Sequence, residues 1–197
     1  MQKNHDVSRE ISDNLDKYSV LLLKWNKTIN LVSARTIADI DERHINDSIQ
    51  LMHYIPNKNT SIIDFGSGAG LPGVVLSICG IREVTLIESD ERKAAFLLQV
   101  AKISSTECKI INDRIENQHD LNCDILTSRA TADLNSIFHY CRNIKVRDKY
   151  LLHKGKSYAA EIEEARKHWL FDITVHDSIT SSEGKILEIT ALKPHTL

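Results

Sequence analysis

A carboxylate followed by four closely spaced glycines is the part of this 197-residue chain whose residue types best suit ligand chemistry. Asp64 precedes Gly66, Gly68, Gly70 and Gly73. Glycine has no Cβ atom and adopts backbone conformations that other residues avoid, so such a run lets a ligand come close to the main chain. Because Asp64 adds a negative charge beside the run, a cationic ligand suits it better than a phosphate.

The residues on either side of the glycines predict the elements that hold them. The apolar run from Ser61 to Phe65 predicts a buried strand, and Leu71 to Cys79 predicts the start of a helix. A strand, a glycine loop and a helix in this order are typical of a nucleotide-type cofactor site.

The glycines allow more than one interpretation. Gly68 to Gly73 is a literal G-x-G-x-x-G dinucleotide motif, but Pro72 has no N–H group for a pyrophosphate and Asp64 would repel one. Read from Asp64, the run is D-x-G-x-G-x-G, which resembles the first motif of Rossmann-like S-adenosylmethionine-dependent methyltransferases. That cofactor has no phosphate and carries a sulfonium and an ammonium group. A structural turn without a ligand is the third interpretation.

Composition sets limits on the class of protein. The 25 basic and 27 acidic residues give a net charge of −2, so the chain as a whole shows no sign of binding nucleic acid, and any RNA contact must come from local clusters. No run of 18 apolar residues and no signal peptide is present, so we expect a cytoplasmic protein without a membrane span. The cysteines form no C-x-x-C pair, which argues against a metal site or disulfides; they are Cys79, Cys108, Cys123 and Cys141.

Two helices are predicted before the glycine loop. Apolar residues at three- and four-residue steps predict the first over residues 7–25, with Ser8 or Asp6 as its cap, and the second over residues 36–54, ended by Pro56. We expect residues 1–56 to form a helical extension packed on a single compact domain over residues 57–197.

Strands and helices alternate after the loop, which predicts a mostly parallel sheet covered on both faces. The last two predicted strands suit a closing hairpin, so we expect a Rossmann-like α/β methyltransferase fold with seven strands, the last of them antiparallel. The further predicted strands span residues 84–88, 109–112, 124–128, 150–153, 171–176 and 185–192, and the helices span 90–104, 134–141 and 158–169.

Polar residues follow several of the predicted strands, where open α/β sheets bind ligands. Glu88 lies at the tip of the second strand, where a carboxylate can accept both ribose hydroxyls of a nucleoside; alternatively, it is an acid at a helix N-terminus. Arg129 follows the fourth strand and could bind a carboxylate, a phosphate or a guanine, or form a surface ion pair with Asp133. Lys154 and Lys156 follow the fifth strand and are either RNA contacts or solvated lysines.

Missing motifs narrow the predicted reaction. The prolines are Pro56, Pro72 and Pro194, so no Asn/Asp-Pro-Pro-aromatic loop for amine methylation and no proline-preceded nucleophilic cysteine exists. An acceptor with a free lone pair, such as guanine N7, needs neither, because attack on a sulfonium methyl requires orientation and electrostatics but no proton removal. Arg129 would then position the reactants, and no general base is expected.

Five motifs in order and spacing make the chain similar to the small-subunit rRNA guanine-N7 methyltransferases, the RsmG or GidB family. They are Lys24-Trp25-Asn26 to Asn30-Leu31, Arg43-His44-Ile45 to Asp47-Ser48, the loop Gly66 to Gly73, Ser128-Arg129-Ala130, and Lys154-Gly155. The resemblance implies methylation of guanine N7 in the 530 loop of 16S rRNA, at position 527, with S-adenosylmethionine as donor. It implies 16S rRNA or the 30S subunit as partner, and we expect a monomer.

Site residues follow from the loop, from the strand ends and from the resemblance. The expected cofactor contacts are Asp64, Gly66, Gly68, Gly70, Leu71, Glu88, Ile115, Glu116 and Arg129, and the expected RNA contacts are Arg43, His44, Lys154 and Lys156. Arg43 and Asp47 share a helix face by their i, i+4 spacing, so an intrahelical ion pair with His44 in the core is the alternative to a site wall. The chain departs from the family pattern at Glu88, Thr131 and His153.

Two other functions stay open on the sequence. A dinucleotide-dependent oxidoreductase would use the literal glycine motif with Glu88 on the ribose, although Pro72 and Asp64 weigh against it. A non-catalytic RNA- or ribosome-binding module would keep the cofactor pocket as a scaffold.

Overall fold

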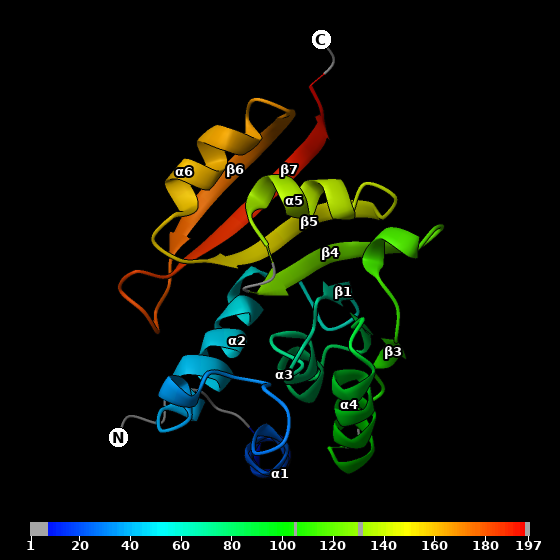
Figure 1. Ribbon diagram of the computed structural model, residues 1–197, viewed down its shortest axis with the longest axis vertical. Coiled ribbons are helices and arrows are strands. Elements are labelled where there is room, and N and C mark those ends of the chain that lie inside the picture. Colours follow the sequence, from blue (N-terminus) through cyan, green and yellow to red (C-terminus); the bar gives the residue numbers. More distant parts are fainter. Residues whose placement is uncertain (1–7, 105, 130–131, 196–197) are drawn as a thin grey trace.

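A seven-stranded sheet lies between two layers of helices in the computed structural model, which describes residues 8–104, 106–129 and 132–195 (Figure 1). The strand order is β3-β2-β1-β4-β5-β7-β6, and β7 runs antiparallel to both of its neighbours while the other pairs are parallel. The predicted Rossmann-like fold is therefore confirmed. The strands are β1 (Ser61–Phe65), β2 (Glu83–Ile87), β3 (Lys109–Ile111), β4 (Asn122–Arg129), β5 (Lys145–Lys154), β6 (Trp169–Asp177) and β7 (Lys185–Pro194).

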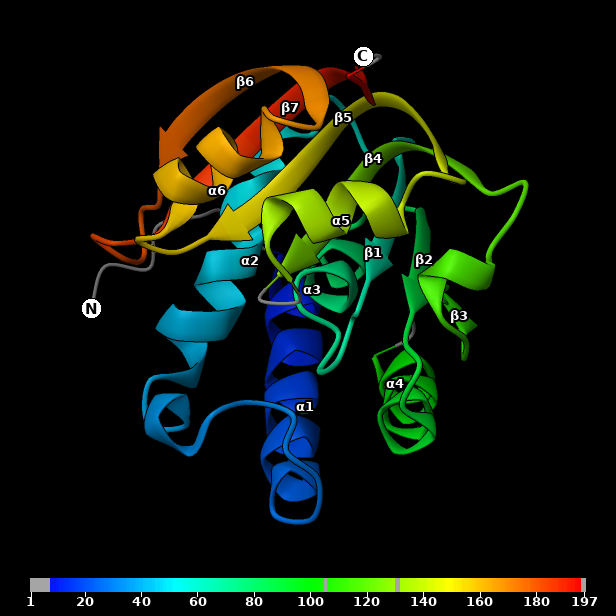
Figure 2. The same cartoon turned by 45° about the horizontal axis from the view of Figure 1, so that its top comes forward.

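Helices cover both faces of this sheet (Figures 1 and 2). One face carries α1 (Arg9–Asn26), α3 (Gly73–Ile78), α4 (Glu91–Ile103) and a helical segment of three joined pieces, η2 (Asp41–Asn46), α2 (Asp47–Ile49) and η3 (Gln50–Tyr54). The other face carries α5 (Leu134–Tyr140) and α6 (Tyr158–Ala165). Two short turns of 3₁₀ helix, η1 (Ala34–Thr36) and η4 (Ile115–Asn117), complete the described elements.

The alternation of side chains along the strands creates two separate cores. In β1, Ile62 packs with α1, α3 and α4, whereas Ile63 packs with α5 on the opposite face. Leu86 and Ile87 of β2 divide in the same way, and all four side chains are at most 3% exposed. Because both faces are covered, the central strands read as continuous apolar runs.

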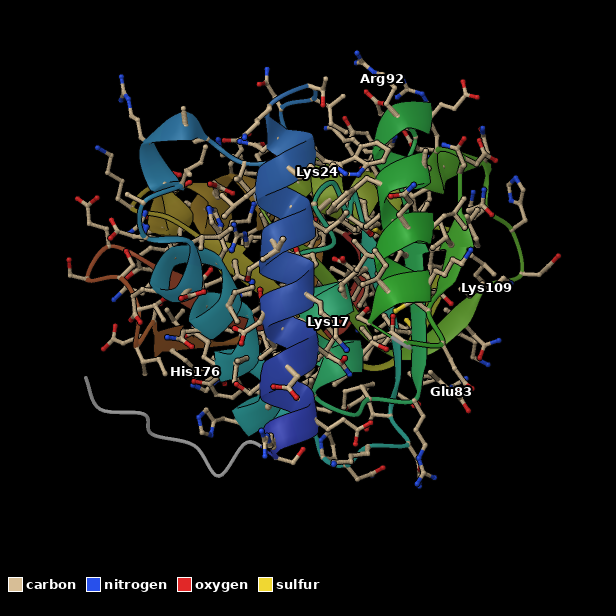
Figure 3. All side chains as sticks on the ribbon, turned by 90° about the horizontal axis from the view of Figure 1, so that it is seen from below. Lys17, Lys24, Glu83, Arg92, Lys109 and His176 are labelled. Atoms are coloured by element: carbon tan, nitrogen blue, oxygen red, sulfur yellow. The ribbon has the colours of Figure 1, made fainter. Side chains whose placement is uncertain are left out.

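One side of helix α1 packs into the core on its face of the sheet, and the other side carries charged residues exposed to solvent. Ser8 accepts a hydrogen bond from the Ile11 N–H, which confirms it as the cap. Tyr18 and Leu22 are completely buried, while Lys17 and Lys24 lie on the outer face (Figure 3). None of the described helices combines the length and apolarity that a membrane span requires.

The structure corrects three of the predicted helix boundaries. A single α-helix over residues 36–54 is wrong: η1 ends at Thr36, a turn follows, and the segment from Asp41 begins as a π-helix and ends as a 3₁₀ helix. Periodicity alone does not separate these helix types. Helix α3 begins at Gly73 because the two residues before it belong to a turn, and α6 ends at Ala165 because Trp169 already opens β6.

Candidate active site

Two cavities open at the carboxyl ends of the parallel strands, where the sequence predicted the chemistry. A cavity of about 140 Å³ lies at the ends of β1, β2 and β3, and its lining includes Gly66, Ile115 and Glu116. A larger cavity of about 650 Å³ lies at the ends of β4 and β5, between the helical segment 41–54 and the β6–β7 turn. We call them the loop cavity and the strand-end cavity.

The loop between β1 and α3 needs glycine for two separate reasons. Gly66, Gly68 and Gly70 have φ angles of 63°, 54° and 86°, in the left-handed region that other residues avoid. At Gly73 the reason is space, since a Cβ atom there would lie 2.4 Å from Cδ2 of Leu86. The run therefore combines a turn with close packing of α3 on the sheet.

Backbone N–H groups of this loop donate to acceptors inside the protein. Gly66 and Ser67 donate to the Ile87 carbonyl, and Gly68 donates to Glu88 at 2.7 Å. Further along, the donors are the N–H groups of Gly70, Leu71, Gly73 and Val74. A pyrophosphate would need such groups turned toward it, so the loop offers few of the contacts on which dinucleotide binding depends.

Asp64 lies beneath the glycine loop and has no exposed surface. Its carboxylate accepts hydrogen bonds from the Gly73 N–H and from the Thr127 hydroxyl, both at 3.2 Å. Burial raises the pKa of Asp64 to about 7, against the opposing effect of these donors and of the Arg129 charge. The side chain thus holds the start of α3 against β1. The expectation that Asp64 contacts the cofactor stays a prediction.

Glu88 joins the tip of β2 to the glycine loop. One carboxylate oxygen accepts the Gly68 N–H at 2.7 Å and the other accepts the Asp90 N–H at 2.8 Å. Asn112 donates to the Glu88 carbonyl from the end of β3. Each carboxylate oxygen has a second lone pair, so ribose hydroxyls can still be accepted.

Tyr18 contacts the glycine loop, which the sequence did not predict. From α1 it donates a hydrogen bond of 2.7 Å to the Ala69 carbonyl, 51 residues along the chain. Burial raises the pKa of Tyr18 well above its usual range, so its hydroxyl stays protonated and able to donate. A buried tyrosine needs a partner for its hydroxyl, and that need was the available signal.

The loop cavity brings together only part of the predicted cofactor set. Gly66, Ile115 and Glu116 line it, and Tyr140 of α5 joins them without having been predicted. Leu71 instead lies in the core beneath the loop, at 5% exposure.

The strand-end cavity collects the other predicted residues. Arg43 and His44 reach it from the helical segment 41–54, Arg129 from the end of β4, and Lys154 and Lys156 from the end of β5. The cavity lining carries both signs of charge: the cations Arg43, Arg129, Lys154, Lys156 and Lys185 are largely offset by the acids Asp47, Asp133, Glu161 and Glu183.

Arg129 pairs with Asp47 and with the backbone of the helical segment. Its Nη1 lies 3.1 Å from Oδ2 of Asp47 and donates to the Arg43 carbonyl at 3.3 Å. Its Nη2 donates to Nδ1 of His44. The predicted alternatives, an Arg43–Asp47 pair and an Arg129–Asp133 pair, are wrong: Asp47 binds Arg129, and Asp133 caps α5 at the Ser136 N–H. Ala130 and Thr131, which belong to the same predicted motif, lie outside the described residues.

The proton positions on His44 follow from its two neighbours. Thr36 donates its hydroxyl proton to the Ser33 carbonyl, so its oxygen accepts from Nε2 of His44 at 2.7 Å. Nδ1 is then free to accept from Arg129. Burial, followed by the charge of Arg129, lowers the pKa of His44 to about 4, which keeps the ring neutral.

The two lysines differ in their surroundings. Lys154 is buried to 7% side-chain exposure, pairs with Glu161 at 2.8 Å and donates to the Ala132 carbonyl. This ion pair links β5 to α6. The contact of Lys154 with RNA stays a prediction. Lys156 is exposed beside the cavity.

His153 occupies the end of β5 and contacts the same helical segment. Its Nε2 lies 2.8 Å from the Asp47 carbonyl, and its Nδ1 is buried without a partner among the described residues. Burial lowers the pKa of His153, so the ring is neutral and Nε2 is the donor.

The sheet order, the glycine loop and the cavities at the strand ends define the Rossmann-like class I methyltransferase fold. Solved structures agree: a magnesium protoporphyrin IX methyltransferase from Synechocystis PCC 6803 with bound S-adenosylmethionine has a TM-score of 0.61 at 12% identity and covers 94% of this chain and 99% of its own. A ribosomal protein L11 methylase from Lactobacillus delbrueckii has a TM-score of 0.60 at 12% identity, covering 73% of this chain and 76% of its own.

Sequence comparison then identifies the family. The model of the family described as rRNA small subunit methyltransferase G matches residues 11–190. The ribosomal RNA small subunit methyltransferase G of Rickettsia prowazekii is 54% identical over 94% of this chain and 97% of its own, and that of Rickettsia rickettsii is 53% identical over 95% and 97%. The chain belongs to this family, as its five motifs predicted.

Proposed function

We propose that this protein transfers a methyl group from S-adenosylmethionine to guanine N7 in the 530 loop of 16S rRNA, either free or within the 30S subunit. Family membership supports rRNA methylation. The choice of guanine N7 rests on the resemblance of the five motifs to guanine-N7 methyltransferases, and the absence of the motifs for methylating an amine or a pyrimidine carbon is consistent with it.

The observation that carries the proposed donor is the hydrogen bonding of the glycine loop. Its N–H groups donate inward, and the first N–H of α3 is taken by Asp64. A phosphate finds little to bind there, whereas a phosphate-free nucleoside needs only close approach to the glycines and a ribose acceptor. Glu88 supplies that acceptor at the loop itself.

We assign the donor to the loop cavity and the acceptor guanine to the strand-end cavity. The proposed cofactor residues are Gly66, Gly68, Gly70, Glu88, Ile115 and Glu116, with Asp64, Leu71 and Tyr18 as support beneath them. Arg129 lines the strand-end cavity, so we propose it as a contact of the guanine in place of the expected contact with the cofactor. For the RNA we propose Arg43 and Lys156 as contacts, with His44 holding Arg129 and Lys154 holding the end of β5.

The proposed acceptor fits the side chains of the strand-end cavity. When bound, S-adenosylmethionine supplies an electrophilic methyl group, which a free lone pair attacks without losing a proton. Arg129 would orient the guanine through O6 or a phosphate, because a hydrogen bond to N7 would occupy the attacking lone pair. His44 is neutral and already donates to Thr36, so its ring orients Arg129 and serves as no base.

Calorimetry distinguishes the donor classes. We expect saturable binding of S-adenosylmethionine and S-adenosylhomocysteine and no binding of NAD at equal concentration. Tight binding of NAD without binding of S-adenosylmethionine would contradict the proposal and favour an oxidoreductase.

Chemical cleavage tests the acceptor atom. 16S rRNA treated with the protein and S-adenosylmethionine should become sensitive to borohydride and aniline at one guanine of the 530 loop, because that treatment cleaves at N7-methylguanine. Methyl transfer to the RNA without cleavage would place the methyl group on another atom. Cofactor and RNA binding without any transfer would favour a non-catalytic module.

A further inference from the structure

Asp47 connects three separate segments that line the strand-end cavity. Its Oδ2 faces Nη1 of Arg129 at 3.1 Å, and its Oδ1 accepts from Thr180 in the β6–β7 turn at 2.7 Å. Its carbonyl oxygen accepts from Nε2 of His153 at 2.8 Å. One residue of the helical segment therefore ties the ends of β4 and β5 to the turn that forms the far wall.

The guanidinium of Arg129 is fixed by contacts on two sides. Asp47 and the Arg43 carbonyl take Nη1, and His44 takes Nη2. The paired side chains of Arg129 and Asp47 are only 16% and 17% exposed. A partly desolvated charged hydrogen bond is stronger and more directional than an exposed ion pair, so this contact restricts a side chain that otherwise has many rotamers.

The same carboxylate also restrains the turn. Gln50, one helical turn after Asp47, donates to Oδ1 of Asp47 at 2.7 Å and accepts from the Ile179 N–H at 3.0 Å. Thr180 and Ile179 are thereby held against the helical segment, although Ile179 itself is 68% exposed. An exposed turn with this many side-chain bonds has a defined position relative to Arg129.

We propose that Asp47 is a positioning residue for methyl transfer: it holds the guanidinium of Arg129 toward the acceptor guanine and couples that orientation to the position of the β6–β7 turn. This inference rests on the proposed function. Asp47 would act on the acceptor through Arg129, without itself contacting the reacting atoms.

A double-mutant cycle tests whether Asp47 acts through Arg129. Asp47→Asn removes the charge and keeps the side-chain shape. We expect it to lower kcat on 30S subunits by about tenfold or more, with the dissociation constant of S-adenosylmethionine unchanged within about twofold. In an Arg129→Ala background the same change should cost less than about twofold, because the side chain that Asp47 orients is already gone.

Asp133→Asn is the matched control. It removes one carboxylate from the lining of the same cavity, and asparagine caps a helix as well as aspartate does. Its effect on kcat, whatever its size, should be the same with and without Arg129. If Asp47→Asn behaves like this control, so that its loss multiplies with that of Arg129→Ala, the inference is overturned.

A second variant keeps the test valid if Asp47→Asn does not fold. Thr180→Val removes the hydroxyl that holds the other carboxylate oxygen, and we expect a smaller loss of kcat that also disappears in the Arg129→Ala background. A loss that persists there would contradict the coupling. An inactive wild-type protein that binds S-adenosylmethionine would instead refute the proposed function, and with it this inference.

Discussion

Asp64 and Gly73 meet in a single hydrogen bond, and each restricts what can replace the other. The Gly73 N–H donates to Oδ2 of Asp64, and a Cβ atom at position 73 would lie 2.8 Å from that same oxygen. The acid and the last glycine of the run therefore form one structural unit. This pairing explains why the glycine pattern extends past the turn that a ligand would approach.

The buried carboxylate of Asp64 predicts an unusual dependence of stability on pH. Its pKa is raised from 3.8 to about 7, so between these values the folded protein binds more protons than the unfolded chain, and stability falls as pH rises. From pH 5.5 to pH 8 the free energy of unfolding should fall by about 2 kcal/mol more in the wild type than in Asp64→Asn. Urea denaturation at the two pH values measures this difference. An equal change in the free energy of unfolding with pH in both proteins would contradict the assignment.

Substitution at Gly68 should mainly affect cofactor binding, and substitution at Gly73 should mainly affect stability. A Cβ atom at Gly68 meets nothing closer than the Gly66 carbonyl at 3.7 Å, so Gly68→Val should cost about 2 kcal/mol of backbone strain, leave the protein folded and abolish binding of S-adenosylmethionine. Gly73→Ala, the control, should lose more stability because of its contact with Leu86. Calorimetry measures cofactor binding by each variant, and thermal unfolding measures its stability. A folded Gly68→Val protein that binds the cofactor normally would refute this placement of the ligand.

Among the elements, α1 contacts the glycine loop in addition to covering the sheet. Tyr18 reaches from its buried side to the carbonyl of Ala69 in the glycine loop, while Lys17 and Lys24 face outward (Figure 3). The helix was predicted from its apolar spacing, but that spacing does not say which residue its tyrosine would meet. The contact joins positions 51 residues apart and depends on how α1 packs on α3.

Removing the Tyr18 hydroxyl should therefore affect both stability and cofactor binding. Tyr18→Phe leaves the buried Ala69 carbonyl without its donor, which should cost about 1–3 kcal/mol and weaken binding of S-adenosylmethionine severalfold. Leu22→Ala is the control, since it opens a cavity under the same helix at a cost of about 2–5 kcal/mol but keeps the hydroxyl that donates to Ala69. Unchanged affinity in Tyr18→Phe, measured by calorimetry on folded protein, would contradict a role for α1 in the site.

The helical segment 41–54 was predicted from the sequence only in part. Its apolar residues indicated a helix correctly, but the i, i+4 spacing of Arg43 and Asp47 suggested an ion pair that does not form. The segment begins as a π-helix, and Asp47 faces Arg129, 82 residues away. Strands, the glycine loop and the order of elements are local patterns and were predictable; pairs such as this one depend on the packed fold.

In the molecule as a whole, the two cores are built from different parts of the chain. The core on the α1 side includes residues from before β1, among them Tyr18, Leu22, Ile45 and Leu51. The core on the α5 side consists of residues from β1 onward. We propose that residues 1–56 are an extension packed on a domain of residues 57–197, and that the protein is a cytoplasmic monomer.

Deleting the extension should expose one face of the sheet layer. A fragment of residues 57–197 loses the partners that bury α3 and α4, so we expect it to bind a hydrophobic dye and to show no cooperative thermal transition. The full chain should melt cooperatively and elute with the mass of one chain in light scattering. A fragment that melts cooperatively near the temperature of the full chain would show that the extension is dispensable for folding.

We propose above all that this protein methylates one guanine of small-subunit rRNA. Mass spectrometry of nuclease fragments of 16S rRNA, from host cells with and without the gene, tests it most directly. We expect one additional methyl group on a guanine of the 530 loop, present only when the gene is present and lost with Gly68→Val. Identical fragment masses in both sets of cells would contradict it.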